Sequence, residues 1–175
     1  MTDSHFPISS PEDELNIKFR AIGLIHSPFK TVAGMPIQPV GATGLTGTVE
    51  VFPEFSEGLN DLDGFSHIIL LYYFHQNKGF KLQVIPFMDT EPRGLFATRS
   101  PKRPNPIGIS VVKLLRRENN FLHVQNVDIL DNTPLLDIKP YIPEIDQYPA
   151  DRIGWLTNVI GSFHHTKADN RFIKE

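Results

Sequence analysis

Residues 107–130 read IGISVVKLLRRENNFLHVQNVDIL, and this stretch decides the fold class. Its two apolar runs, 107–115 and 121–130, are rich in β-branched and aromatic side chains, which favour strands. The polar turn Glu118-Asn119-Asn120 lies between the two runs, a pattern typical of a hairpin. The stretch therefore predicts a β-hairpin in a protein built mainly from strands.

Further strands are expected on both sides of this hairpin. Residues 47–52, GTVEVF, alternate between two faces with the period of a half-buried strand. Other β-branched and apolar runs predict strands at 17–27, 82–87, 94–99 and 135–142. Fifteen prolines and twelve glycines punctuate the chain, so its elements must be short and joined by turns. The pattern predicts a mostly β, single-domain protein with short peripheral helices.

Residues 68–74, IILLYYF, differ from the other runs because they are apolar on both faces. A strand of this kind needs cover on both sides. The core supplies one cover, and another layer or a second subunit must supply the other. A homodimer contact would provide it.

Three regions are predicted along the 175 residues. Residues 1–16 are polar and acidic and are interpreted as a loosely attached tail, whereas 17–149 form the β domain. Beyond Pro149, apolar residues recur at the spacing of an amphipathic helix of about three turns, which predicts a helical appendage over 150–175. This stripe consists of Ile153, Leu156, Ile160 and Phe163. The longest apolar run is far shorter than the ~20 residues of a membrane-spanning helix, so no membrane association is expected.

The composition narrows the functional classes. The net charge of −3 argues against a protein that coats nucleic acid through bulk positive charge, so any RNA contact must be local. The absence of cysteine excludes disulfides, thiolate zinc sites and cysteine nucleophiles, and it is compatible with the cytoplasm, where we expect the protein. None of the seven histidines lies in a metal-ligand motif, so no metal is expected.

Positive charge is concentrated in residues 93–117, which hold seven basic and no acidic side chains. Within this block, three prolines stiffen the loop 100–106. A stiff loop that carries Arg99, Arg103 and Asn105 loses little entropy when it binds a phosphate, a carboxylate or a base edge. Two other interpretations stay open: a solvated face balanced by acids elsewhere, or an ordinary rigid turn.

Three aspartates follow the hairpin. Asp128 lies in an apolar-flanked strand, where an ionised carboxylate is costly unless it meets a cation or hydrogen-bond donors, so it is a candidate functional residue. Asp131 begins the turn sequence Asp-Asn-Thr-Pro and is either functional or an Asx-type turn former. Asp137 is the third, with Lys139 two residues later.

Five segments carry a resemblance to a known family. They are AIGLIHSPFK (21–30), GMPIQP (34–39), LDGFSHIILLYYFH (62–75), GLFATRSPKRPNPIGISVV (94–112) and ILDNTPLLDIKPYIP (129–143). In content and order they resemble the TrmO (TsaA-like) family. The resemblance implies a β-barrel that uses S-adenosylmethionine, acts as a homodimer and methylates tRNA. The implied acceptor is the exocyclic nitrogen of threonylcarbamoyl-adenosine at position 37 of threonine tRNAs.

The resemblance also implies roles for individual residues. Those expected to contact the cofactor are Pro36, Ile37, Gln38, Phe74, His75, Arg99, Ile109, Gln125, Asn126, Val127 and Asp128. Arg99 would hold the methionine carboxylate, and Asp128 would accept hydrogen bonds from the ribose or adenine. The residues expected to face the tRNA are Lys102, Arg103, Asn105, Lys139 and Tyr141.

The general base is unassigned, with His75, Asp131 and Asp137 as candidates. One departure from the family pattern is Asn132, where glycine is usual after the aspartate. Because asparagine tolerates a left-handed backbone, we expect the turn to survive. An alternative function stays open, a non-catalytic RNA-binding or nucleotide-binding β-barrel module.

Overall fold

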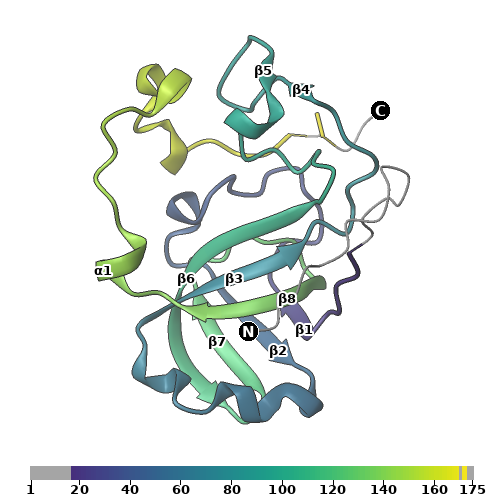
Figure 1. Ribbon diagram of the computed structural model, residues 1–175, viewed down its shortest axis with the longest axis vertical. Coiled ribbons are helices and arrows are strands. Elements are labelled where there is room, and N and C mark those ends of the chain that lie inside the picture. The colour runs from purple at the N-terminus through teal and green to yellow at the C-terminus, as the bar shows by residue number, and fades with distance from the viewer. Residues whose placement is uncertain (1–16, 170, 173–175) are drawn as a thin grey trace, which may run out of the picture.

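A closed six-stranded barrel forms the centre of the computed structural model, which describes residues 17–169, 171 and 172 (Figure 1). Its strands are β1 (Gly23–His26), β2 (Thr46–Val51), β3 (His67–Tyr73), β6 (Ile107–Glu118), β7 (Phe121–Gln125) and β8 (Thr133–Pro140). They are neighbours in the order β1-β2-β7-β6-β3-β8, and β8 pairs with β1 to close the barrel. All six pairings are antiparallel. The predicted β-barrel is confirmed, whereas the predicted tail 1–16 lies outside the described residues.

The predicted hairpin is β6 and β7, which pair up to Glu118 and Phe121. Asn119 turns the chain with φ of 55°, a left-handed conformation that asparagine tolerates. Strand β6 runs three residues beyond the predicted end at 115, and β7 ends at Gln125 because Asn126 leaves the extended conformation with φ of 70°. β6 is therefore the longest strand, and it carries residues from one end of the barrel to the other.

Two predicted strands are much shorter than expected. Gln83–Val84 (β4) and Arg93–Gly94 (β5) form a separate two-stranded ribbon, and residues 95–97 form a 3₁₀ turn where 94–99 was predicted as a strand. The turn forms because Leu95 is buried and the Thr98 hydroxyl donates a hydrogen bond to its carbonyl. Residues 95–106, which we call the basic loop, therefore begin with a bend at the end of the barrel.

The core lies inside the barrel and is built from alternate residues of every strand. It includes Ile25, Val49, Val51, Ile68, Leu70, Val112, Leu122, Val124 and Leu135. The other face of β3 points outward, where Ile69 is paired with Val111 and Leu71 with Ile109 of β6. Short 3₁₀ turns at Pro39–Ala42, Pro53–Leu59 and Leu62–Gly64 connect the strands.

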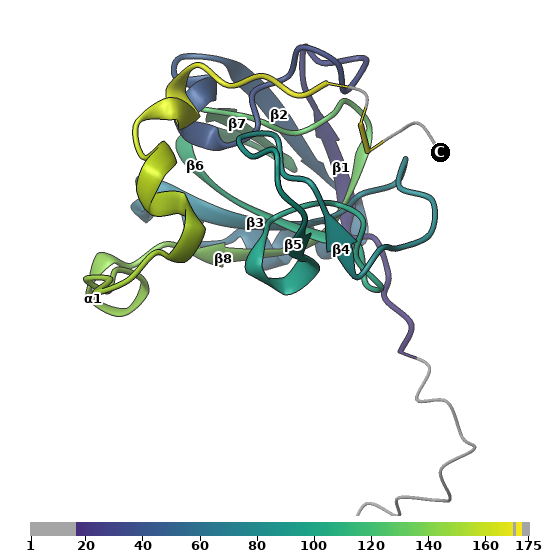
Figure 2. The same cartoon turned by 90° about the horizontal axis from the view of Figure 1, so that it is seen from above.

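After β8 the chain forms one helical turn, α1 (Pro143–Asp146), and then returns to the barrel (Figure 2). The predicted three-turn helix is wrong. Residues Gly154–Val159 and Ser162–His164 form two 3₁₀ helices instead. Gly161 separates them with φ of 90°, a left-handed conformation that no α-helix accommodates. We call residues 150–169, 171 and 172 the terminal segment.

The terminal segment is hydrogen-bonded to residues 34–45, which we call the Gly-Pro loop. The Ala168 amide donates to the Met35 carbonyl at 2.7 Å, and the Gly34 amide donates to the Ala168 carbonyl at 2.8 Å. Pro36 and Lys167 form an isolated antiparallel bridge. Figure 1 shows the terminal segment and the β4–β5 ribbon at the same end of the barrel.

Candidate functional site

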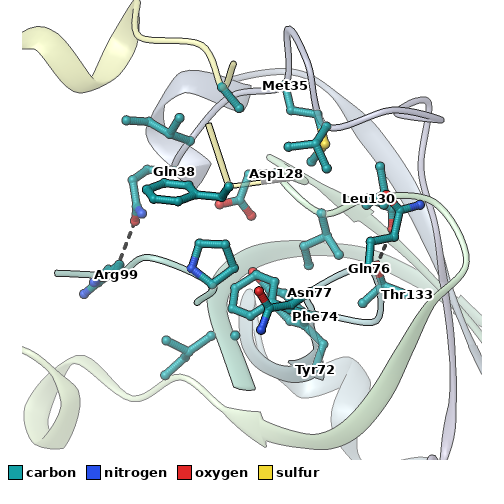
Figure 3. A pocket seen from close by; sticks show the side chains of 18 of the residues that line it. Met35, Gln38, Tyr72, Phe74, Gln76, Asn77, Arg99, Asp128, Leu130 and Thr133 are labelled. Carbon is teal, nitrogen blue, oxygen red and sulfur yellow. Dashed lines mark hydrogen bonds between the residues drawn. The ribbon is translucent and has the colours of Figure 1, made fainter. Parts of the chain in front are cut away.

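A cavity of about 340 Å³ lies at this end of the barrel, and we call it the barrel cavity. Five parts of the chain line it: the Gly-Pro loop, the end of β3, the basic loop, the start of β6 and the segment that leads into β8. Gln38 and Arg99 lie on one side in Figure 3 and Leu130 and Thr133 on the other, with the Asp128 carboxylate between them. Segments far apart in the sequence thus converge on one space.

A chain of hydrogen bonds fixes Asp128. The Ser110 hydroxyl donates to Asp128 Oδ1 at 2.7 Å, and the Tyr72 hydroxyl lies 3.1 Å from Ser110 Oγ. Because the single Ser110 proton points to Asp128, the Tyr72 hydroxyl must donate to Ser110. Ser110 and Tyr72 are both buried, so the carboxylate is held in one orientation.

The cavity also perturbs the protonation of these groups. Burial raises the pKa of Asp128 to about 6, against the lowering effects of the Ser110 hydrogen bond and the Arg99 charge. Burial and the neighbouring Asp128 charge raise the pKa of Tyr72, which keeps the phenol protonated. Asp128 is therefore ionised at neutral pH, yet it lies where a cationic ligand would stabilise its charge.

Arg99 lies across the cavity mouth. Its Nη1 donates to Gln38 Oε1 at 3.1 Å, which ties the basic loop to the Gly-Pro loop. Among the described residues Arg99 forms no ion pair with a carboxylate. The rest of its guanidinium fork is free to bind an anionic group.

His75 lies in the cavity wall with its ring oriented by Thr133. The Thr133 hydroxyl donates to the Leu130 carbonyl at 2.6 Å, so its 3.4 Å contact with His75 Nδ1 is satisfied when Nδ1 carries the proton. Burial lowers the pKa of His75, which makes the ring neutral at pH 7. In this tautomer Nε2 holds the free lone pair and can accept a proton.

Two aromatic rings form the floor of the cavity. Tyr72 and Phe74 make an edge-to-face contact with their centroids 5.4 Å apart. Gly108 makes room for them, because a Cβ at this position would lie 2.3 Å from Tyr72 Cε2 and 2.9 Å from Phe74 Cζ. The glycine of the Pro-Ile-Gly string is thus required by side-chain packing, since its own φ is not left-handed.

Asn77 has an unsatisfied acceptor in the cavity lining. Its Nδ2 donates to the Gly79 carbonyl at 2.9 Å, whereas the buried Oδ1 has no hydrogen-bond partner among the described residues. A buried carbonyl oxygen without a partner is costly, by about 1–3 kcal/mol.

The structure brings eight of the eleven residues predicted to bind the cofactor to this cavity. These are Pro36, Ile37, Gln38, Phe74, His75, Arg99, Ile109 and Asp128. Ile109 lies at the margin, with 52% of its surface exposed on the outer face of β6.

The other three residues predicted to bind the cofactor, Gln125, Asn126 and Val127, do not line the cavity. Val127 is fully buried in the barrel core. Asn126 turns the chain, and its Oδ1 accepts a hydrogen bond from the Gly44 amide at 3.0 Å. Asn126 thus joins the end of β7 to the Gly-Pro loop.

Two of the three candidate bases also lie away from the cavity. Asp131 pairs with Lys30 and accepts a hydrogen bond from the Ser27 amide, and these contacts lower its pKa although burial opposes them. Asp131 thus has a structural role that differs from an Asx-type turn, because its carboxylate binds residues about 100 positions earlier in the chain and not the nearby backbone. Asp137 forms an ion pair with Lys139 at 2.7 Å on the outside of the barrel. His75 is the candidate that the structure places at the cavity.

The residues expected to face the tRNA lie apart from one another. Arg103 lines the barrel cavity, and Asn105 is exposed in the same loop. Lys139 lies near the end of β8, and Tyr141 follows this strand with its amide donating to the His67 carbonyl. The expectation for Lys102 is wrong. Lys102 is only 3% exposed, because its ammonium group donates a hydrogen bond to the Lys78 carbonyl at 2.9 Å.

The basic block does not form one positive surface. Arg93 pairs with Asp89, Arg116 pairs with Glu118, and Arg117 donates to the Leu59 carbonyl. The interpretation as a face balanced by acids elsewhere thus holds for this part of the block. Arg99 and Arg103 are the basic residues of the block that reach the cavity.

Neither a metal centre nor a membrane helix is found in the described chain. No group of three or more His, Asp or Glu side chains there is arranged to hold a metal ion. None of the helices in the same residues has the length and hydropathy to cross a bilayer.

Sequence reasoning missed several residues of the cavity. Tyr72 and Asn77 were absent from the predicted set, as were Thr98 and Thr133. Tyr72 and Asn77 flank the predicted pair Phe74 and His75, so their proximity in the sequence was the available signal. The terminal segment was also missed, because its apolar residues were interpreted as a helix stripe.

Comparisons with known proteins agree with this geometry. Residues 24–147 match the family described as tRNA-methyltransferase O N-terminal domain. A probable S-adenosyl-L-methionine-binding protein of Pyrococcus abyssi is 56% identical over 158 residues, which cover 90% of this chain and 86% of that protein. The tRNA (adenine(37)-N6)-methyltransferase of Escherichia coli is 34% identical over 144 residues, 77% of this chain and 61% of that protein.

The crystal structure of TrmO from Pseudomonas aeruginosa has the same fold. It superposes with a TM-score of 0.68 at 38% identity and covers 81% of this chain. The match covers 63% of the Pseudomonas chain, so this chain spans about three fifths of the length of that relative and of the Escherichia coli enzyme. With the barrel, the cavity and the matched motifs in agreement, the chain belongs to the tRNA-methyltransferase O family.

Proposed function

We propose that this protein is an S-adenosylmethionine-dependent tRNA methyltransferase that acts on the exocyclic nitrogen of adenine-37. The observation that carries this proposal is the barrel cavity, which presents a buried carboxylate, aromatic rings and a free guanidinium to one ligand. In the finer form of the proposal, the acceptor base carries a threonylcarbamoyl group and belongs to threonine tRNAs. Because tRNA is the substrate, a cytoplasmic location is part of the proposal.

The cavity fits S-adenosylmethionine in size and in chemistry. Its volume of about 340 Å³ lies within the range of small-molecule sites. A sulfonium cation is stabilised by a carboxylate such as Asp128 and by the faces of aromatic rings such as Phe74. Arg99 can bind the carboxylate of the methionine part.

When bound, S-adenosylmethionine supplies an electrophilic methyl group, whose transfer breaks an S–C bond, forms an N–C bond and releases a proton from the acceptor nitrogen. The protein's part is to align the two reactants and to receive that proton. Asp128 and Arg99 fix the donor end of the site, so the alignment costs little entropy at the moment of reaction. His75, neutral and with Nε2 free, is the group in the cavity best suited to accept the proton.

A homodimer is part of the proposal. The outer faces of β3 and β6 carry paired apolar residues in register, and several of them are exposed. These residues are Ile69, Leu71, Tyr73, Ile109 and Val111. Such a patch is typical of a protein–protein interface, and a second copy of the chain would cover it.

The alternative function is a non-catalytic RNA-binding barrel. The two hypotheses differ in that only the enzyme must bind S-adenosylmethionine. The test is methyl transfer from labelled S-adenosylmethionine to tRNA prepared with or without the threonylcarbamoyl group. We expect label only in the preparation that carries the group. Equal labelling of both preparations would contradict threonylcarbamoyl-adenosine as the specific acceptor. If the protein neither labels tRNA nor binds S-adenosylmethionine, the methyltransferase proposal is contradicted.

A further inference from the structure

A second cavity of about 720 Å³ adjoins the barrel cavity, and we call it the outer cavity. The two share a wall that includes Gln38, Thr98, Arg99 and Pro101, with the hydrogen bond from Arg99 to Gln38 within it. The outer cavity is therefore the neighbouring space into which a group leaving the barrel cavity would pass.

The lining of the outer cavity is mainly aromatic. Phe87, Phe96, Trp155, Phe163 and Phe172 all contribute to it. Phe96 is 75% exposed, which is unusual for a large apolar side chain on a protein in water. The Arg103 guanidinium lies 5.6 Å from the centre of the Phe96 ring, and Arg99 lines the same cavity as Phe96. An exposed aromatic ring with cationic side chains around it can bind an unstacked nucleobase by stacking and its phosphate or acidic substituent by charge.

Three of these five rings belong to the terminal segment, which is fixed in place by specific contacts. The Trp155 indole nitrogen donates to the Ala97 carbonyl at 2.9 Å, and the Arg93 guanidinium lies 5.9 Å from the centre of the Trp155 ring. Phe172 packs edge-to-face on Phe87 at 4.8 Å. The wall is thus formed before any ligand arrives.

The terminal segment lies beyond residues 24–147, the part of the chain that matches the family. Its contribution to a cavity next to Arg99 is therefore a feature that the family match does not account for.

We propose that the outer cavity, walled by the terminal segment, holds the acceptor purine base, turned out of the anticodon loop and stacked on Phe96 and Trp155. This inference rests on the proposed function, since it assigns the methyl donor to the barrel cavity. Transfer between two bound groups requires reacting atoms about 3–3.5 Å apart, so the acceptor must enter through a space that adjoins the donor. An enzyme that modifies a base of a folded RNA must also take that base out of its stack.

Trp155 is the only tryptophan of the chain, so its fluorescence reports on the outer cavity alone. The probe is an anticodon stem-loop RNA that carries threonylcarbamoyl-adenosine at position 37, compared with the same RNA without a base at that position. We expect the first RNA to quench Trp155 and the second to leave it unchanged. Equal quenching by both RNAs would overturn the proposal.

Phe96→Ala supplies the second test, because the exposed Phe96 side chain can be removed without disturbing the core. We expect its affinity for the stem-loop to fall at least about fivefold, the lower end of the contribution of one base–aromatic stack, with S-adenosylmethionine binding by calorimetry within twofold of the wild type. The matched control is Phe121→Ala, at the far end of β6 from the cavities, where Phe121 is 37% exposed. We expect this variant to bind both ligands as the wild type does.

The two proposals fail in different ways. The outer cavity does not hold the base if the wild type transfers methyl groups but its Trp155 fluorescence does not change with the stem-loop, and Phe96→Ala binds the stem-loop as the wild type does. A Phe96→Ala variant that loses affinity for S-adenosylmethionine, with RNA binding unchanged, would also overturn the assignment. If Trp155 responds to the base but no methyl donor binds, the outer cavity is supported as a base site and the methyltransferase proposal fails.

Discussion

At Asp128 a carboxylate is held where burial disfavours its charge. Its pKa rises from 3.8 to about 6 on folding, so the folded state binds a proton more tightly than the unfolded chain. Protonation of Asp128 therefore makes its full contribution to the free energy of unfolding below pH ~4, and this contribution is lost as the pH rises through about 6. The proposed role of Asp128 in binding the sulfonium cation needs the opposite state, the ionised carboxylate.

Asp128→Asn is expected to separate stability from binding. At pH 7.5 the variant should be more stable than the wild type by about 1–3 kcal/mol, because no buried charge is left to desolvate. Its affinity for S-adenosylmethionine should fall about tenfold or more, since a charged partner is lost. Denaturant unfolding and calorimetry measure the two effects. Asp137→Asn, which removes an exposed carboxylate, is the control and should change neither quantity by more than a small amount.

The same group predicts a pH dependence of binding. As pH falls below about 6, Asp128 becomes neutral and the affinity of the wild type for S-adenosylmethionine should decline, approaching a tenfold loss per pH unit. Calorimetric titrations between pH 5 and 8 test this. His75 also gains a proton at low pH, so the comparison with Asp128→Asn is needed. A decline of equal size in that variant would assign the effect to another group.

Arg99 and Arg103 are expected to differ although they lie four residues apart. Arg99→Ala should weaken S-adenosylmethionine binding by about 10–100-fold, the range for a lost charge-assisted hydrogen bond, and tRNA binding by less. Arg103→Ala should show the reverse order, because its guanidinium lies over the exposed Phe96 ring at 5.6 Å. Filter binding measures the affinity of each variant for tRNA relative to the wild type, and calorimetry measures its relative affinity for S-adenosylmethionine. If the order is the same in both variants, the assignment of Arg99 to the donor is wrong.

At the scale of elements, the start of β6 is where the barrel and the site depend on each other. Gly108→Ala would place a methyl group against the Tyr72 and Phe74 rings, which must move to accept it. We expect a loss of about 1–3 kcal/mol in unfolding free energy and weaker cofactor binding. Gly64→Ala is the matched control, because a Cβ there meets nothing within 4 Å and its φ is not left-handed. A Gly108→Ala variant as stable as this control would show that the rings are not closely packed.

The sequence predicted the barrel elements better than it predicted their ends. The alternation in 47–52 and 107–115 depends on burial of one strand face, which is a local property, so β2 and β6 were found. The 94–99 run failed because the direction of the chain there is set by burial of Leu95 and by a side-chain hydrogen bond from Thr98. No periodicity encodes such a tertiary contact.

The predicted site residues also divide into those that local sequence could place and those that depend on tertiary structure. Residues inside distinctive strings, such as Arg99 and Phe74, were placed at the cavity correctly. Val127 was not, because the spacing of a motif does not show which side of the barrel wall a side chain faces. Asn132 kept its turn as expected, with φ of 58°. Trp155 escaped prediction because its contact with Ala97 joins residues 58 positions apart.

At the scale of the whole molecule, the proposed homodimer would form through the outer face of β3 and β6. Val111→Lys places a charge in the apolar patch, and a buried unpaired charge at an interface is strongly unfavourable. We expect this variant to sediment as a monomer under conditions in which the wild type is a dimer. Leu115→Lys, on the same strand beyond the residues paired with β3, is the control and should remain dimeric. A dimeric Val111→Lys would place the interface elsewhere.

The bridge between Pro36 and Lys167 has a consequence for the order in which the protein is made. The last barrel strand ends at Pro140, so the ribosome has delivered every barrel strand while Trp155, Phe163 and Phe172 of the outer cavity are still to be added. During synthesis the Gly-Pro loop is therefore made long before the terminal segment that bridges to it. A nascent chain that contains all the barrel strands still lacks this wall of the outer cavity. We therefore expect the barrel cavity to gain its lining from Ala168 and Phe172 only after all the barrel strands have been made.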